Sequence, residues 1–233
     1  MKDIPRFTKT PVLLKNNCLS LRHTTITCLA VRKTFLYIVI ALLPLIGFGQ
    51  NVNIGDILCT DGSIVSPDGY LSSGRTAKGV VFYVDESNQH GWAVHLDYQG
   101  GVRWSFTYDD IPALPNYQKM REAINDFDGY ENTRKIRQAG NASTYPAAWA
   151  VDFDEGWYLP AAGQIRYLYG YIPEVNRSLD LVGGSLFVLS SDWWLWASTE
   201  CSHEDAWDMN SQGNEGHSKK SDHSFYVRAV TNF

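Results

Sequence analysis

The sequence has few cysteines. Only four of its 233 residues are Cys, and two of them, Cys18 and Cys28, lie within the first 30 residues. This scarcity excludes the dense disulfide frameworks of small secreted domains, and no zinc-ligand signature is present. Cys59 and Cys201 are left in the rest of the chain. In an oxidising compartment this pair could form one disulfide, which would tie the start of the domain to its end, although spacing alone does not establish the geometry.

Long apolar runs are also lacking. The longest, residues 35–48, has 14 residues and follows Arg32-Lys33, whereas a membrane-spanning helix needs about 20. A basic start, a short apolar stretch and small residues at its end are typical of a secretory signal peptide. We expect a signal peptide over 31–49 and one domain over 50–233, with no stable membrane span once the signal is removed. Residues 1–30 are interpreted as a mis-annotated leader, with a genuine extension as the alternative.

An excess of basic residues is missing as well. Residues 1–49 hold seven Lys/Arg and one Asp, which leaves 13 basic and 24 acidic residues and a formal charge of −11 in the expected mature chain. A protein that neutralises nucleic-acid phosphates needs a basic surface, and anionic membranes are disfavoured for the same reason. The composition excludes nucleic acid as the expected partner and favours neutral sugars, cations or basic partners.

Sequence motifs of catalysis are absent. The chain has no nucleophile elbow and no phosphate-binding loop. Asp152, Asp154 and Glu155 form a carboxylate cluster, but they directly precede Gly156-Trp157 and a turn accounts for them. We therefore expect a protein that is not an enzyme.

Aromatic residues are abundant, since all eight Trp and 12 of 13 Tyr lie within residues 50–233. Their patterns predict a strand, turn and strand over 51–66, turns at 67–69 and 72–74, and a hairpin of strands 79–85 and 91–96. Helical spacing and start signals predict the helices 117–127 (capped by Asn116), 132–138, 145–151 and 160–171.

The last third of the chain carries the most distinctive pattern. A strand is predicted around Trp193-Trp194-Leu195-Trp196, with Trp194 and Trp196 on a core face and Trp193 on the other, surface-reaching face. The final strand is predicted at 226–230.

The order of these blocks resembles the Lcl C-terminal domain family. The blocks are Gly156-Trp157-Tyr158-Leu159-Pro160-Ala161, residues 193–200, residues 206–210 and residues 226–230. The resemblance implies an α+β, C-type-lectin-like fold, with a mixed, mostly antiparallel sheet, flanking helices and a last strand adjacent to the first. Gln164 stands where the family usually has Glu. Related formylglycine-generating enzymes depend on a closely spaced Cys pair, which this chain lacks.

Polar and glycine-rich residues between Glu200 and Lys220 form the candidate binding site, because polar loops on a rigid β scaffold commonly carry recognition. The predicted ligand-binding residues are His203, Glu204, Asp205, Trp207, Asp208, Asn210 and Lys219. We expect no cofactor; Ca²⁺ is the alternative, because hard oxygen ligands gather here. His203, His217 and Asp205 could also suit a transition metal.

These observations predict a secreted, periplasmic or cell-surface bacterial protein without catalytic activity. The expected role is recognition of a glycan or a surface protein, as in an adhesin. Two alternatives stay open: a structural or assembly subunit of a surface appendage, and an enzyme of the formylglycine-generating-enzyme-like fold.

Overall fold

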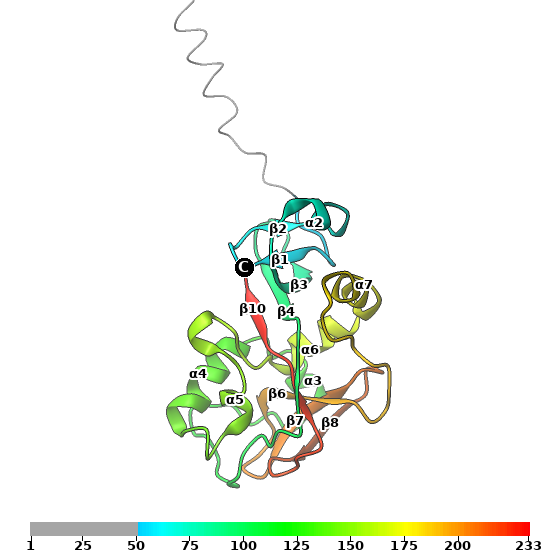
Figure 1. Cartoon of the computed structure of the whole chain (residues 1–233). Coiled ribbons are helices and arrows are strands. Elements are labelled where there is room, and N and C mark those ends of the chain that lie inside the picture. The colour runs from blue at the N-terminus through cyan, green and yellow to red at the C-terminus, as the bar shows by residue number, and fades with distance from the viewer. Residues whose placement is uncertain (1–50) are drawn as a thin grey trace, which may run out of the picture. The chain divides into compact units, whose positions relative to one another are not determined.

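Residues 51–233, which a computed structural model describes, fold into two five-stranded sheets with helices packed against them (Figure 1). The predicted leader (1–30) and signal peptide (31–49) lie outside the described residues. Among the described helices, none has both the length and the apolar character needed to span a membrane. The α+β class and the mainly antiparallel pairing are confirmed, and the strands are divided between two sheets.

The first sheet has the strand order β10-β4-β3-β1-β2. Its strands are β1 (Ile57–Cys59), β2 (Ile64–Val65), β3 (Ala77–Val84), β4 (Gly91–His95) and β10 (Val230–Asn232). The predicted hairpins are confirmed, with Ile57 opposite Val65 and Val80 opposite Val94. The predicted pairing of the last strand with the first is wrong, because β10 pairs with β4 (Figure 1).

The second sheet has the order β5-β9-β6-β7-β8. Its strands are β5 (Gln99–Gly100), β6 (Trp194–Glu200), β7 (Asp205–Asn210), β8 (Glu215–Lys219) and β9 (Tyr226–Val227). The predicted final strand is thus split between the sheets, since β9 lies in the second and β10 in the first. β9 runs parallel to β6, and the β6–β7 and β7–β8 pairs are antiparallel.

Some of the helices lie where local sequence signals predict them, and others do not. The helices are α2 (Pro67–Ser73), α3 (Met120–Ala123), α4 (Gly129–Ala139), α5 (Pro146–Trp149), the 3₁₀ turn η2 (Phe153–Glu155), α6 (Ala162–Tyr169) and α7 (Ile172–Val182). The helices predicted near α4, α5 and α6 are confirmed, with shifted ends. The turns predicted at 67–74 are wrong. The Ser66 side chain caps a helix there, Pro67 occupies its first turn and Gly74 ends it at φ +66°.

The helix predicted over 117–127 is also wrong in extent, because α3 retains only four of those residues. Its expected first turn is extended and paired with β6: Asn116 bridges to Glu200, and the Tyr117 backbone N–H donates to the Glu200 carbonyl at 3.0 Å. The Trp207 indole N–H donates to the Tyr117 carbonyl at 2.7 Å. These tertiary hydrogen bonds outweigh a weak helical preference.

Two large apolar clusters use opposite faces of the second sheet. One lies between the two sheets and helices α6 and α7, and includes Trp193, Leu195, Trp207 and Met209. The other holds Trp196 with residues of α4, α5 and the 102–114 connection. The predicted exposure of Trp193 is therefore wrong: it is buried, and Trp194 is the tryptophan that stays half-exposed.

The disulfide that Cys59 and Cys201 could have formed is absent, because both are buried free thiols in separate apolar clusters. Burial also raises the pKa of the Cys201 thiol, which keeps it protonated and unreactive. Treatment with dithiothreitol should therefore leave the melting temperature of the purified protein unchanged. A bridge of this span would contribute about 2–5 kcal/mol. A drop of more than about 4 °C on reduction would contradict the free-thiol arrangement.

Candidate functional site

The predicted binding segment is a β-hairpin and not a loop. Strands β7 and β8 pair in continuous register from Asp205 opposite Lys219 to Met209 opposite Glu215. The turn between them is shaped by Asn210, whose side-chain oxygen accepts from the backbone N–H groups of Gln212 at 3.1 Å and Asn214 at 2.9 Å. Asn210 is thereby buried and holds the turn together.

Charged members of the predicted site gather at the opposite, open end of the hairpin. The Lys219 ammonium pairs with the Glu204 carboxylate and lies 3.4 Å from Asp205 Oδ1. His217 Nδ1 lies 3.4 Å from Asp205 Oδ2, and His203 Nε2 lies 3.6 Å from Glu204 Oε1. Lys219 lowers the pKa of Glu204, and Glu204 raises the pKa of Lys219. These groups are engaged with one another at the surface.

Trp207 and Asp208 point to opposite faces in the middle of β7, and both are buried. Trp207 packs in the cluster between the sheets, with its ring edge-on to His217 at 5.6 Å. Asp208 lies opposite Trp196 and Gly216. The structure thus brings His203, Glu204, Asp205 and Lys219 together and separates Trp207, Asp208 and Asn210 from them.

Asp208 is electrostatically unusual. Burial raises its pKa to about 6, outweighing the Ser218 hydroxyl and His217, which favour the ionised form. Its Oδ2 atom has no hydrogen-bond partner among the described residues. An ionised, partly unsatisfied carboxylate inside a sheet is costly.

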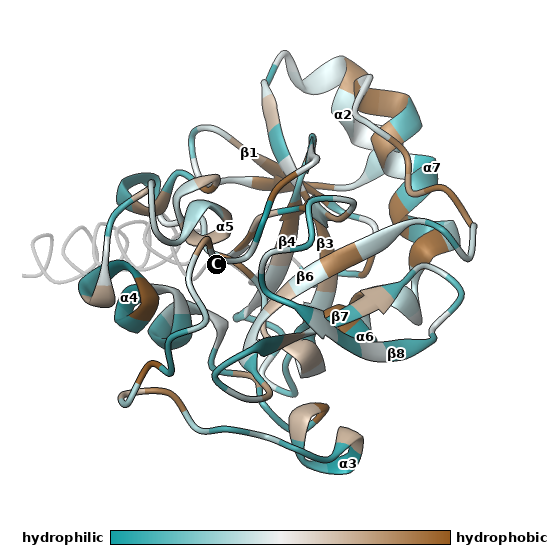
Figure 2. Cartoon of the chain, turned by 90° about the horizontal axis from the view of Figure 1, so that it is seen from below, coloured by the Kyte–Doolittle hydropathy of each residue, from teal (hydrophilic) through white to brown (hydrophobic). Residues whose placement is uncertain are grey.

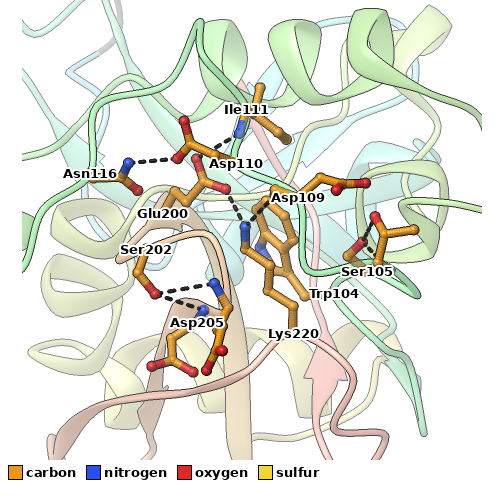
Figure 3. Close-up of polar contacts among 12 residues, drawn as sticks. Trp104, Ser105, Asp109, Asp110, Ile111, Asn116, Glu200, Ser202, Asp205 and Lys220 are labelled. Carbon is orange, nitrogen blue, oxygen red and sulfur yellow. Dashed lines mark hydrogen bonds and ion pairs between the residues drawn. The ribbon is translucent and has the colours of Figure 1, made fainter.

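A buried ion pair, which was not predicted from the sequence, lies next to the hairpin. Glu200 at the end of β6 and Lys220 just after β8 form an ion pair that is fully removed from solvent (Figure 3). Lys220 Nζ also donates to the Asp109 carbonyl at 3.0 Å and lies 4.8 Å from the centre of the Trp104 ring. Burial raises the pKa of Glu200, while Lys220 opposes that shift. The pair fastens the hairpin to the 104–111 connection.

Arg228 is the third buried charge and lies where the chain passes from β9 to β10. Its Nε donates to the His95 carbonyl at 2.9 Å and its Nη2 to the Leu96 carbonyl at 2.8 Å. Its guanidinium also stacks over the Phe187 ring at 4.2 Å. Burial lowers its pKa to about 9. These contacts hold the two sheets together at the crossing point.

Open hollows mark the described surface, among them the following three. One of about 250 Å³ lies near His95, Asp97 and Trp157. Two others, of about 380 Å³ and 470 Å³, lie on either side of the end of α6 and share Arg166 and Gly170. Asp208, Glu200 and Arg228, the groups with buried charge, line none of these three hollows.

No group of three or more His, Cys, Asp or Glu side chains within residues 51–233 is arranged to hold a metal ion. Asp205 and Asp208, both named as possible oxygen ligands, lie on opposite faces of β7, because successive side chains of a strand alternate. The Ca²⁺ alternative thus gains no support from the geometry of this hairpin.

The comparisons with known proteins show a similarity in structure and none in sequence family. No protein-family model matches the sequence, and no curated protein is similar to it. The fold is similar to that of a fimbrial protein from Bacteroides ovatus ATCC 8483, with a TM-score of 0.57 at 15% sequence identity. The similarity covers 78% of this chain and 49% of the fimbrial protein. The chain therefore corresponds to about half of that protein.

Proposed function

We propose that this chain is an exported, non-catalytic subunit of a bacterial surface appendage, with a domain of the C-type-lectin-like type. The fold that it shares with a fimbrial protein is the observation that carries the proposal. A fold alone does not fix a function, so the surface of the molecule has to supply a means of assembly.

An exposed aliphatic patch supplies it. The connection between α7 and β6 exposes Leu186, Val188 and Leu189 by 42%, 52% and 65%; we call these three residues the 186–189 patch. The intervening Phe187 is buried, and the Asn176 side chain exchanges two hydrogen bonds with its backbone, of 2.8 and 2.9 Å.

The backbone of the patch is fixed by hydrogen bonds on both sides of Phe187. The Ser211 hydroxyl donates to the Val188 carbonyl, and the Ser185 backbone N–H donates to the Leu96 carbonyl at 2.9 Å. Three neighbouring aliphatic side chains held rigidly in water are typical of a protein contact surface. Because the segment is already ordered, little conformational entropy would be lost on association.

The buried charges favour a structural role over catalysis. Groups that perform acid–base chemistry need a shifted pKa and access to a substrate. Asp208 and Glu200 have shifted pKa values, but both are buried and no substrate could reach them. Recognition through residues 203–219 remains a weaker second reading, because Lys219, Glu204 and Asp205 already pair with each other.

Self-association of the purified, exported chain tests the proposal. Sedimentation velocity between about 1 and 100 μM should show concentration-dependent oligomers without added ligand. Replacing Leu186, Val188 and Leu189 by Ser should weaken association at least about ten-fold, because burying aliphatic side chains drives such contacts.

Leu71→Ser is the matched control, since Leu71 is 76% exposed on α2 and lies outside the patch. It should leave association unchanged. A protein that stays monomeric over the whole range, or that loses association equally in both variants, would contradict assembly through the 186–189 patch.

A further inference from the structure

A cluster of aromatic rings reaches the surface beside α6. Trp92 stacks on Tyr83 at 4.2 Å and on Phe127 at 5.9 Å between ring centres. Tyr167 meets all three rings edge-on at 5.2 to 6.0 Å. Phe127 and Tyr167 are exposed, whereas Tyr83 and Trp92 are half-buried beneath them. The exposed rings are therefore fixed from below and present rigid apolar faces.

These rings border the hollow of about 470 Å³. Its lining residues are Ile124, Asn125, Phe127, Arg166, Tyr167, Gly170 and Tyr171. Asn125 uses its amide N–H₂ to donate to the Arg121 carbonyl at 2.6 Å. No described residue donates to its side-chain oxygen. This hollow thus combines aromatic faces with a free hydrogen-bond acceptor.

The neighbouring hollow of about 380 Å³ is polar. It is lined by Tyr169, Ser211, Gln212, Gly213 and Glu215, from α6 and the β7–β8 turn. These elements lie side by side (Figure 2). The Gln212 side-chain amide is exposed and makes no hydrogen bond to any residue of the described part. Arg166 and Gly170 belong to both hollows, so the two adjoin at the end of α6, and we call them together the α6 groove.

The charge of this groove is balanced. Arg166 and Glu215 are the charged residues that line it, and they form an ion pair with each other. Glu215 is largely buried while Arg166 remains half-exposed. A carboxylate, sulfate or phosphate ligand would therefore meet no unpaired cation here.

We infer that this groove binds an uncharged oligosaccharide, with Tyr167 and Phe127 stacking against the C–H face of one sugar. Gln212, Asn125 and the outer N–H groups of Arg166 hydrogen-bond the hydroxyls of that sugar and the next. Such a ligand matches both halves of the groove, because a pyranose has an apolar face and a polar rim. None of the three patch residues lines this groove, although Ser211 adjoins both surfaces, and the inference does not rest on assembly through the 186–189 patch.

A printed array of neutral and acidic oligosaccharides, probed with the purified exported protein, tests this inference. Neutral glycans should bind, and trisaccharides of the bound type should bind more tightly than the monosaccharide, since the groove spans two hollows. For the strongest neutral glycan, calorimetry should show Kd raised at least about ten-fold in Tyr167→Ala and in Gln212→Ala. Tyr167→Phe, which keeps the ring, should stay within about three-fold of the unaltered protein.

Tyr130→Ala is the matched control. Tyr130 also lies on a helix, is 40% exposed against 42% for Tyr167, and stacks on an aromatic ring, that of Phe153. Its removal should leave Kd unchanged. An array with no neutral glycan bound, or an equal loss in Tyr130→Ala and Tyr167→Ala, would overturn the proposal. Gln212 lies in an exposed turn, so Gln212→Ala keeps the test valid if Tyr167→Ala fails to fold.

Discussion

Replacing Lys220 by Met should destabilise the protein by about 3–5 kcal/mol, because it leaves the buried Glu200 carboxylate without its counter-charge. For a domain of this size that corresponds to a fall in melting temperature of roughly 6–20 °C. Thermal and urea unfolding followed by circular dichroism would measure both quantities. The loss includes the contact of the ammonium with the Trp104 ring and its hydrogen bond to Asp109.

The pH dependence of this variant separates charge from packing. Glu200 already has a pKa above its ordinary value of 4.5 because of burial, and removing Lys220 raises it further. A carboxyl group whose pKa is higher in the folded state than in the unfolded state destabilises the folded protein at pH values above its folded-state pKa. It has no such effect at pH values below its unfolded-state pKa, where it is protonated in both states. The stability deficit of Lys220→Met should therefore shrink as the pH falls from neutral towards 4.5.

Two further variants act as controls. Lys219→Met removes the adjacent, exposed ammonium and should leave the melting temperature almost unchanged, because surface ion pairs contribute little. The double variant Glu200→Gln with Lys220→Met removes both charges and should recover most of the loss. If Lys219→Met and Lys220→Met were equally unstable, the buried ion pair would not be what holds the hairpin to the 104–111 connection.

Replacing Asp208 by Asn should stabilise the protein by about 3 kcal/mol at pH 8. The pKa of Asp208 is raised from 3.8 to about 6, and each unit of difference is equivalent to about 1.4 kcal/mol. The penalty is absent below pH 3.8, where the group is protonated in both states, and is complete above about 6. The stability difference between variant and unaltered protein should therefore grow as the pH rises from about 4 to 6.

Urea unfolding at a series of pH values would measure this difference. The charges of His217, Asp205 and Asp222 also influence the pKa of Asp208, so the comparison needs a variant on the same strand. Asp205→Asn serves, because Asp205 is partly exposed and pairs with Lys219 and His217. A pH-independent difference for Asp208→Asn, or the same profile for both variants, would show that burial of the Asp208 charge is not the cause.

The candidate site could be predicted only in part. The hairpin character of residues 205–219 was obscured by its many polar and glycine residues, which resemble a loop. Trp207 was predicted as a ligand-binding residue, whereas the structure buries it in the cluster between the sheets. The aromatic cluster of Tyr83, Trp92, Phe127 and Tyr167 carried no sequence signal, since its members come from four separate segments. The pairing of Glu200 with Lys220 likewise joins residues 20 positions apart.

The sequence by itself determined those elements whose apolar residues alternate or recur at helical spacing. They are the β3–β4 hairpin, strand β6, and helices α4 and α6. Alternation and spacing of apolar residues act between neighbours, so they can be read without the rest of the chain. The tertiary structure alone decided which partners these elements take. It unwound most of the helix expected at 117–127 by pairing Tyr117 with Glu200, sent the last strand to β4, and set which tryptophan of β6 is exposed. These outcomes depend on hydrogen bonds and burial between distant residues, which no local pattern specifies.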